Sequence, residues 1–257
     1  MDAVAPAKPV RIKRWLPYWA VFQADVRQTV RSWVFRTWVL ISILATAGYL
    51  LYSYGVLREA GIRQPASKLV SDLLRWSLLG SVTLIIALTA GCISSERGTV
   101  ADSILSRGIS RYQYFLGKWH SRLVTILGTF VLTSAFMLAG SYFLLHDDLS
   151  VMGSLVALAT VCVLLAAVIS CGVTVSAIVN NSVMAIAVLW LTLCAGGFIL
   201  SVLPARLPLP DWSLSHLTYV LQGYYDLHKL GRLAGWSALF SCLAALVGLV
   251  YFSRRDV

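Results

Sequence analysis

Charged side chains are scarce in this sequence. They make up 12% of its 257 residues, whereas hydrophobic residues make up 58%, and the mean hydropathy is +0.78. An ordinary soluble domain has about 25% charged and about 45–50% apolar residues. The composition therefore excludes a soluble globular protein and predicts an all-α integral membrane protein.

Acidic residues are the scarcer of the two charges. The chain has 21 Lys and Arg against 11 Asp and Glu, which gives a net charge of +10. In a soluble protein this excess would suggest a nucleic-acid partner. In a membrane protein, Lys and Arg gather in the cytoplasmic segments, which explains the same excess. We therefore expect no nucleic-acid partner.

The signatures of common enzymes are also absent. Gly117-Lys118 is followed by Trp119 and lacks the upstream glycine of a nucleotide-binding Walker A loop. Neither the Gly-x-Ser-x-Gly motif of hydrolases nor the His-Glu-x-x-His motif of metalloproteases occurs. The chain is thus expected to be no enzyme by itself.

Ion-coupled carriers commonly place ionisable groups at mid-membrane, where burial is costly. No apolar segment of this chain has an Asp, Glu, Lys or His well inside it. This argues against a self-sufficient carrier, although main-chain and hydroxyl sites remain open.

No metal site is expected either. The five cysteines lie in or beside apolar segments without forming close pairs, as in Cys162 and Cys171, which would face opposite sides of one helix. A metal site at His216, Asp226 and His228 is the alternative, but an exposed polar surface explains these residues better.

The apolar segments predict a single transmembrane domain over residues 1–257. Residues 1–32 form a cytoplasmic tail and an elbow helix, 33–252 a six-span membrane domain, and 253–257 a second tail. The spans are expected at about 34–56, 74–94, 122–145, 151–178, 183–203 and 234–252. A polar outer loop is expected from Arg58 to Asp72. The insert between the last two spans contains Pro204 and Pro210 and is expected to form short or re-entrant helices at the outer surface.

The elbow helix is predicted from a stripe of apolar residues in the segment 14–32. Trp15, Trp19, Phe22, Val26 and Val30 share one helical face, opposite a basic face. This pattern is typical of a helix that lies in the membrane interface. An early start of the first span is the weaker alternative, because it would bury Asp25 and two arginines.

The distribution of Lys and Arg predicts the orientation. With the N-terminus inside, the inner segments hold seven up to Arg36, five from Arg97 to Arg122, and two near the C-terminus. The outer segments hold seven in total. The excess inside, with an even number of spans, puts both termini in the cytoplasm.

Small residues line one face of the second span, which favours close helix packing over a cavity. The expected packing positions are Gly80, Ala87, Ala90 and Gly91, with Thr83 on the same face.

The loop 94–118 has more structure than a connection needs. Thr99 with Asp102, and Ser110 with Gln113, are capping-box-like helix starts. Val100, Ile104 and Leu105 would form the apolar face of a short helix between them. An apolar face in an aqueous loop predicts a partner that covers it.

The same loop carries a family resemblance. The runs Ser95-Glu96-Arg97-Gly98-Thr99, Ile104-Leu105-Ser106, Ile109-Ser110-Arg111 and Gly117-Lys118 resemble the first cytoplasmic loop of ABC-2 type transporter permeases. The final run Phe252-Ser-Arg254-Arg255-Asp256 resembles the end of the same family. Arg107-Gly108 departs from the family, which more often has a proline there.

The resemblance implies the transmembrane subunit of an ABC transporter in the inner membrane, with export as the direction of transport. Two copies, or one copy and a homologue, would form the pathway, and separate ATPase subunits would bind ATP and Mg. This chain would then bind no cofactor itself.

The residues expected to couple it to the ATPase are Glu96, Arg97, Gly98, Thr99, Val100, Asp102, Ile104, Leu105, Ser106, Ile109, Ser110 and Arg111. Those expected along the substrate pathway are Trp76, Thr83, Trp190 and Thr192. The alternative function is a non-transporting membrane anchor or assembly factor that recruits a soluble partner through the same loop.

Overall fold

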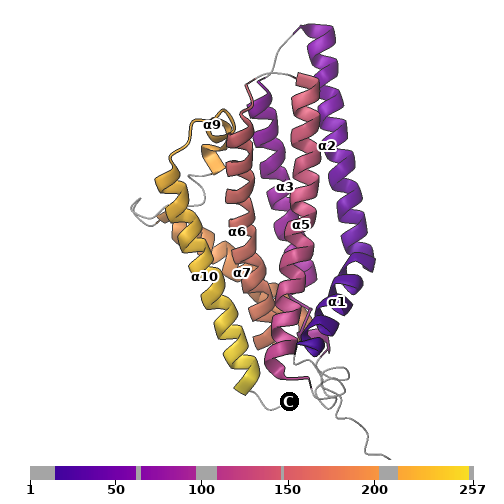
Figure 1. Ribbon diagram of the computed structural model, residues 1–257, viewed down its shortest axis with the longest axis vertical. Helices are drawn as coiled ribbons and strands as arrows, with labels where there is room; N and C mark the ends of the chain where they lie inside the picture. Colours follow the sequence, from indigo (N-terminus) through magenta and orange to yellow (C-terminus); the bar gives the residue numbers. More distant parts are fainter. Residues whose placement is uncertain (1–14, 62–64, 97–108, 146–147, 203–213, 255–257) are drawn as a thin grey trace, which may run out of the picture.

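A computed structural model describes residues 15–61, 65–96, 109–145, 148–202 and 214–254, and the regular elements in these ranges are all helices (Figure 1). Five of them are long and apolar enough to cross a membrane. These five are α2 (Trp33–Ala60), α3 (Ala66–Thr89), α5 (Arg111–Leu145), α6 (Val151–Ile178) and α10 (Leu227–Arg254). The expected helical fold is therefore confirmed for these ranges, and its five long apolar helices suggest a multi-pass membrane protein.

The remaining elements are shorter. They are α1 (Leu16–Arg31), the 3-10 helix η1 (Ser94–Glu96), α7 (Ser182–Val202) and α9 (Leu217–Leu221). Helix α7 occupies the place of the expected fifth span and is apolar, but its stretch Ser182–Gly197 is shorter than the five long helices. The sixth crossing therefore stays a prediction.

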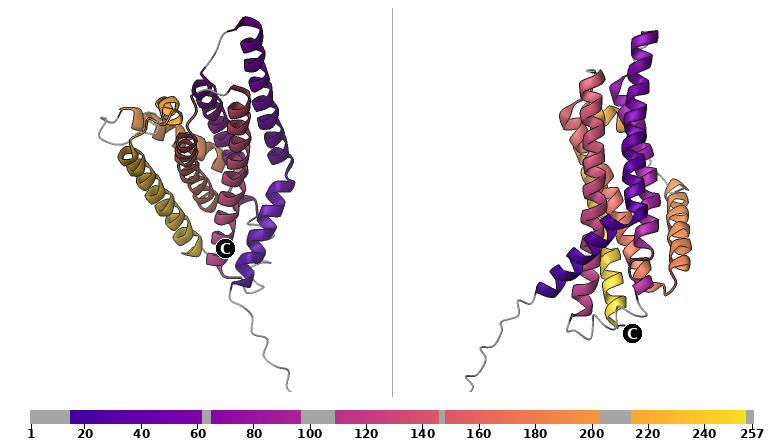
Figure 2. Two further views of the ribbon diagram at one scale, coloured as in Figure 1. Left: turned by 45° about the horizontal axis from the view of Figure 1, so that its top comes forward. Right: turned by 90° about the vertical axis from the view of Figure 1, so that its right-hand side faces the viewer.

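The long helices form a bundle with two distinct ends (Figure 1). At one end, here called the loop end, α1 and α5 begin and α3 and α10 finish. At the opposite end, the far end, α2 and α5 finish and α6 and α10 begin, beside α9. Helix α7 stands at the edge of the bundle, with its beginning near the loop end (Figure 2).

Helix α6 provides much of the packed interior. One stripe of it is fully buried at every fourth residue, as expected for a helix face that meets neighbours along its whole length. The stripe consists of Ala157, Val161, Leu165, Ile169, Val173 and Ala177, all with no exposed area. Helices α3, α5 and α10 pack around α6.

The helix boundaries follow from local capping. Ser32 and Ser150 cap α2 and α6 by accepting hydrogen bonds from Phe35 N and Gly153 N. The predicted capping box before α5 is confirmed, because Gln113 N donates to Ser110 Oγ and Ser110 N donates to Gln113 Oε1, each at 3.2 Å.

The expected polar loop from Arg58 to Asp72 is much shorter in the structure. Helix α2 continues to Ala60 and ends at Gly61, whose φ of 64° suits a glycine after a helix. Helix α3 then begins at Ala66 directly after Pro65. The sequence prediction followed hydropathy, which does not register that the Asp148 carboxylate accepts a hydrogen bond from Ser67 Oγ at 2.6 Å in the polar first turn of α3.

Candidate functional site

A cluster of ionised side chains lies at the loop end, where α1, η1 and α5 meet. Lys118 Nζ on α5 is 2.8 Å from Asp25 Oδ1 on α1 and 2.7 Å from Glu96 Oε1 on η1. Arg122, one turn along α5, lies 3.1 Å from the same oxygen of Asp25. Ser121 Oγ donates to the other oxygen, Asp25 Oδ2. We call these five residues the ion cluster.

Burial makes the ion cluster unusual. The side chains of Asp25 and Lys118 are 1% and 4% exposed. Burial alone raises the pKa of the Asp25 carboxyl, but the adjacent charges of Arg122 and Lys118 lower it by a larger amount. The pKa of Asp25 therefore lies below its ordinary value. Asp25 is thus a carboxylate, and the two acids balance the two bases.

The ion cluster fixes one stem of the 97–108 segment. Glu96, the last residue described before it, receives the Lys118 ion pair on one oxygen, and Tyr114 OH donates to the other at 2.6 Å. Both partners belong to α5. The chain thus enters the segment from a point attached to a long helix.

The other stem is fixed as well. Ile109 packs against the interior, and Ser110 is held by the capping box. Arg111 Nη1 donates to Ser253 O near the end of α10, at 3.3 Å. Both stems of the 97–108 segment are therefore attached to α5, and through it to α1 and α10.

The structure brings together only part of the predicted coupling set. Glu96, Ile109, Ser110 and Arg111 lie at the loop end as described above. The other members, Arg97, Gly98, Thr99, Val100, Asp102, Ile104, Leu105 and Ser106, lie outside the described residues, and so does the predicted short helix.

The four predicted substrate-pathway residues do not form one site. Trp76 on α3 is 72% exposed and Trp190 on α7 is 47% exposed. Thr83 and Thr192 are exposed and donate to carbonyls of their own helices, those of Leu79 and Val188. All four side chains lie on the outside of this single chain.

The small residues of α3 and of the turn after it contact two neighbouring helices, α7 and α2. Ala90 is buried against Ala185 and Leu189 of α7, and Gly91 approaches Ser182. Gly80 lies instead beside Trp38 of α2, whereas Ala87 is exposed.

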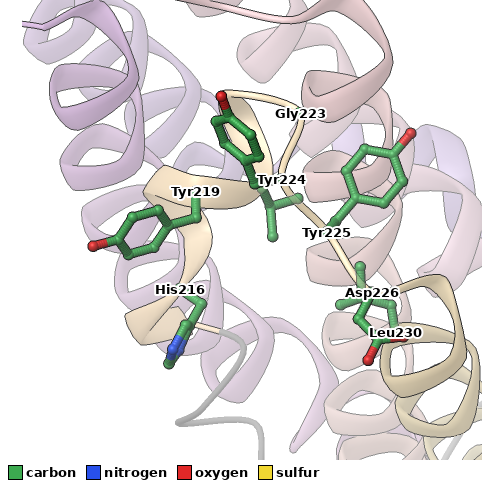
Figure 3. Close-up of a pocket in the computed structure, with 8 residues that line it drawn as sticks. His216, Tyr219, Gly223, Tyr224, Tyr225, Asp226 and Leu230 are labelled. Atoms are coloured by element: carbon green, nitrogen blue, oxygen red, sulfur yellow. The ribbon is translucent and has the colours of Figure 1, made fainter.

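A cavity of about 490 Å³ lies at the far end, apart from the ion cluster. Its lining includes His216, Tyr219, Tyr225 and Asp226, but Tyr219 and Tyr225 point in different directions rather than toward one centre (Figure 3). Asp226 accepts hydrogen bonds from the backbone at the start of α10, and His216 bonds Ser215. Within the described part of the chain, His, Cys, Asp and Glu side chains form no metal-binding group.

The sequence interpretation missed Asp25, Lys118 and Arg122 as a unit. It treated Asp25 as part of the polar face of the elbow helix, whereas the structure buries it against α5. The sequence held a signal, because Asp25 is the only acid in α1. With Val21 and Thr29, at a spacing of four residues, it lies on one face of this helix. Lys118 and Arg122 repeat the same spacing on α5.

No protein-family model matches the chain, and no curated protein matches it.

Proposed function

We propose that this chain is the transmembrane permease subunit of an ABC transporter, driven by separate ATPase subunits that contact its 94–118 loop. Two permease chains form the substrate pathway in the inner membrane, and the loop end faces the cytoplasm. ATP and Mg are bound by the ATPase subunits. When the ATPase subunits close on ATP, their movement passes through the loop to the helices and drives export.

The observation that carries this proposal is the attachment of both loop stems. A loop that transmits force must not yield at its base, and Glu96 and Arg111 connect the segment to α5, with Asp25 of α1 and Ser253 of α10 behind them. A plain connecting loop would not need a buried ion cluster, because burying charges is costly unless each one is paired.

The exposed face of α1 agrees with the same function. Trp15 and Trp19 are 67% and 54% exposed, while the opposite face of α1 packs on α5. Their stripe is suited to the membrane interface. Helix α1 is then the elbow of the permease, and it joins the interface to the loop through Asp25.

The test targets the apolar face of the loop segment. The double variant Ile104→Asp, Leu105→Asp should insert and fold normally but fail to co-purify with the partner ATPase, because a buried Leu or Ile side chain contributes about 1.5–3 kcal/mol to an interface. The matched control, Ala3→Asp with Val4→Asp, adds the same charge to the N-terminal tail and should retain the ATPase. Pull-down and ATP turnover in reconstituted membranes are the measurements.

Three results would count against the proposal. If the Ile104 and Leu105 double variant keeps both the ATPase and normal transport, the loop is not the coupling element. If a soluble partner without ATPase activity is bound through the loop, the chain is a membrane anchor or assembly factor. If one copy with its ATPase transports alone in native mass measurements, the two-copy pathway is wrong.

A further inference from the structure

A groove of about 190 Å³ lies between α2, α3 and α5, away from the ion cluster. It opens on the outer surface of the bundle, where Trp76 is 72% exposed. Gly80 lines it without a side chain, and a Cβ there would lie 3.4 Å from the indole nitrogen of Trp38. A glycine therefore leaves room beside Trp38 that any larger residue would fill.

The groove contains a buried hydroxyl that has no hydrogen bond. Ser134 lines the groove and is only 2% exposed, and its Oγ has no hydrogen-bond partner among the described residues. On the same helix Thr129 and Ser141 donate to carbonyls four residues earlier, whereas Thr125 Oγ1, which does not line the groove, is unpaired like Ser134 Oγ. An unpaired hydroxyl in an apolar environment is unfavourable, so a ligand that bonds Ser134 would relieve this cost.

Trp38 and Trp76 are further hydrogen-bond donors in the lining of the groove. An indole nitrogen can only donate a hydrogen bond. Trp119 donates to Ser170 Oγ, but across the described ranges neither Trp38 nor Trp76 has such a partner. Trp76 follows Arg75 directly, near the polar start of α3, a position typical of tryptophans at the membrane interface. The groove thus combines an apolar lining with hydrogen-bond donors.

We propose that this groove binds a lipid-soluble molecule by inserting one aromatic ring whose carbonyl oxygen accepts a hydrogen bond from Ser134. The size agrees, because a cavity of about 150 Å³ in another protein binds benzene. A larger molecule leaves its remainder in the bilayer and enters from the side. The binding itself does not depend on an ATPase; only its use as a loading site for exported cargo rests on the proposed function.

The experiment uses benzophenone, an apolar aromatic ketone that photolabels its surroundings, on the full chain in lipid nanodiscs without any ATPase. Labels should concentrate on 38–46, on 73–80 and on Met137, which line the groove. Acetophenone should compete about fivefold more strongly than ethylbenzene, which has the same ring but no oxygen, because one net hydrogen bond contributes about that much.

Two variants and one control isolate the groove. Gly80→Leu fills it and should remove the concentrated labelling, whereas Gly128→Leu should not, because nothing lies within 4 Å of a Cβ at that position. Ser134→Ala keeps the shape but should abolish the preference for acetophenone over ethylbenzene. This second variant keeps the test decisive if Gly80→Leu does not fold.

Labels spread evenly over the lipid-facing helices would overturn the proposal. So would equal competition by ethylbenzene in the wild-type protein, which would show that Ser134 donates no hydrogen bond to the bound molecule. A preference for acetophenone that survives in Ser134→Ala would also overturn it. Loss of ATPase binding in the loop variants leaves these results unchanged, so the two proposals fail separately.

Discussion

At the scale of single residues, the carboxylate of Asp25 holds three side chains of α5 in place: Lys118, Ser121 and Arg122. Such a cluster is stable only while each of its buried charges has a partner. Replacing all of its charges by apolar groups can be neutral, but removing one partner leaves the others buried without a counter-charge. Arg122 is already under-satisfied, since its Nε is buried without a partner in the described residues.

We therefore expect Asp25→Asn to be strongly destabilising although it preserves the shape of the side chain. Lys118 and Arg122 would stay buried beside a neutral amide, and breaking a buried pair in this way costs about 3–5 kcal/mol. Thermal unfolding in detergent, followed by size-exclusion chromatography, measures the change. Asp226→Asn is the control, because Asp226 is exposed and caps α10, where asparagine caps equally well, and its exposed ion pair with Lys229 contributes little. Equal melting temperatures for both variants would show that the ion cluster does not stabilise the fold.

The pH dependence of this difference follows from the lowered pKa of Asp25. A carboxyl whose pKa is lower in the folded state stabilises it at pH values above the unfolded pKa of about 3.9. This stabilisation is lost as the pH falls through the folded value. The gap in melting temperature between wild type and Asp25→Asn should thus be constant near neutrality and narrow below about pH 4. A gap that widens on acidification would contradict an ionised Asp25.

At the scale of elements, the contact between α3 and α6 depends on Gly172. A Cβ at this position would overlap Thr89 Oγ1 and lie 2.8 Å from Thr89 Cβ. Thr89 cannot turn away easily, because it is fully buried and donates to Ile85 O at 2.6 Å. Interior glycines of membrane helices commonly permit this close approach.

Gly172→Ala should therefore destabilise the bundle by about 1–3 kcal/mol, the usual cost of overpacking. Adding Thr89→Gly, which removes both the Oγ1 and the Cβ of Thr89, should remove most of that cost, so that the double variant unfolds close to Thr89→Gly alone. Gly128→Ala, which faces open space, should leave stability unchanged or slightly raised. Additive effects of Gly172→Ala and Thr89→Gly in thermal unfolding would show that the two residues do not interact.

The same elements show what sequence patterns can and cannot provide. Helix α6 coincides with the predicted span 151–178, because its apolar run is interrupted at both ends by polar residues. The start of α5 was recognisable because a capping box is a local arrangement of Ser110 and Gln113. The early start of α3 was not, because its polar first turn is held by Asp148, a residue far along the chain.

The ion cluster could not be predicted from hydropathy. Hydropathy treats Asp25 and Lys118 as polar residues that should face water, and it contains no information on the distance between them. Their burial depends on pairing across 93 positions of sequence. The sequence alone thus indicated Glu96 but not Lys118, Asp25 and Arg122, the buried charges behind it.

At the scale of the whole molecule, the path of α7 bears on the number of membrane crossings. Helix α7 begins at the loop end, where Ser182 Oγ lies 3.2 Å from Ser94 Oγ of η1. The chain is next described around α9 at the far end, where Ser150 N donates to Leu221 O at 2.9 Å. Between these two points the chain passes from one end of the bundle to the other. A helix of α7's length spans about 31 Å, close to the bilayer core of about 30 Å.

We therefore predict six crossings, with the loop and the C-terminus on the cytoplasmic side. Cysteine-free protein carrying Ser103→Cys, Val257→Cys or Tyr224→Cys can be probed with a membrane-impermeant thiol reagent in intact cells. Tyr224 is 76% exposed at the far end, so its cysteine should react from outside. The other two should react only after the membrane is opened, because the segments around them carry the larger share of Lys and Arg.

If Val257→Cys reacts from outside while Ser103→Cys does not, the number of crossings is odd and α7 does not span. If Ser103→Cys reacts only from outside, the orientation is inverted, and an ATPase in the cytoplasm could not reach the 94–118 loop.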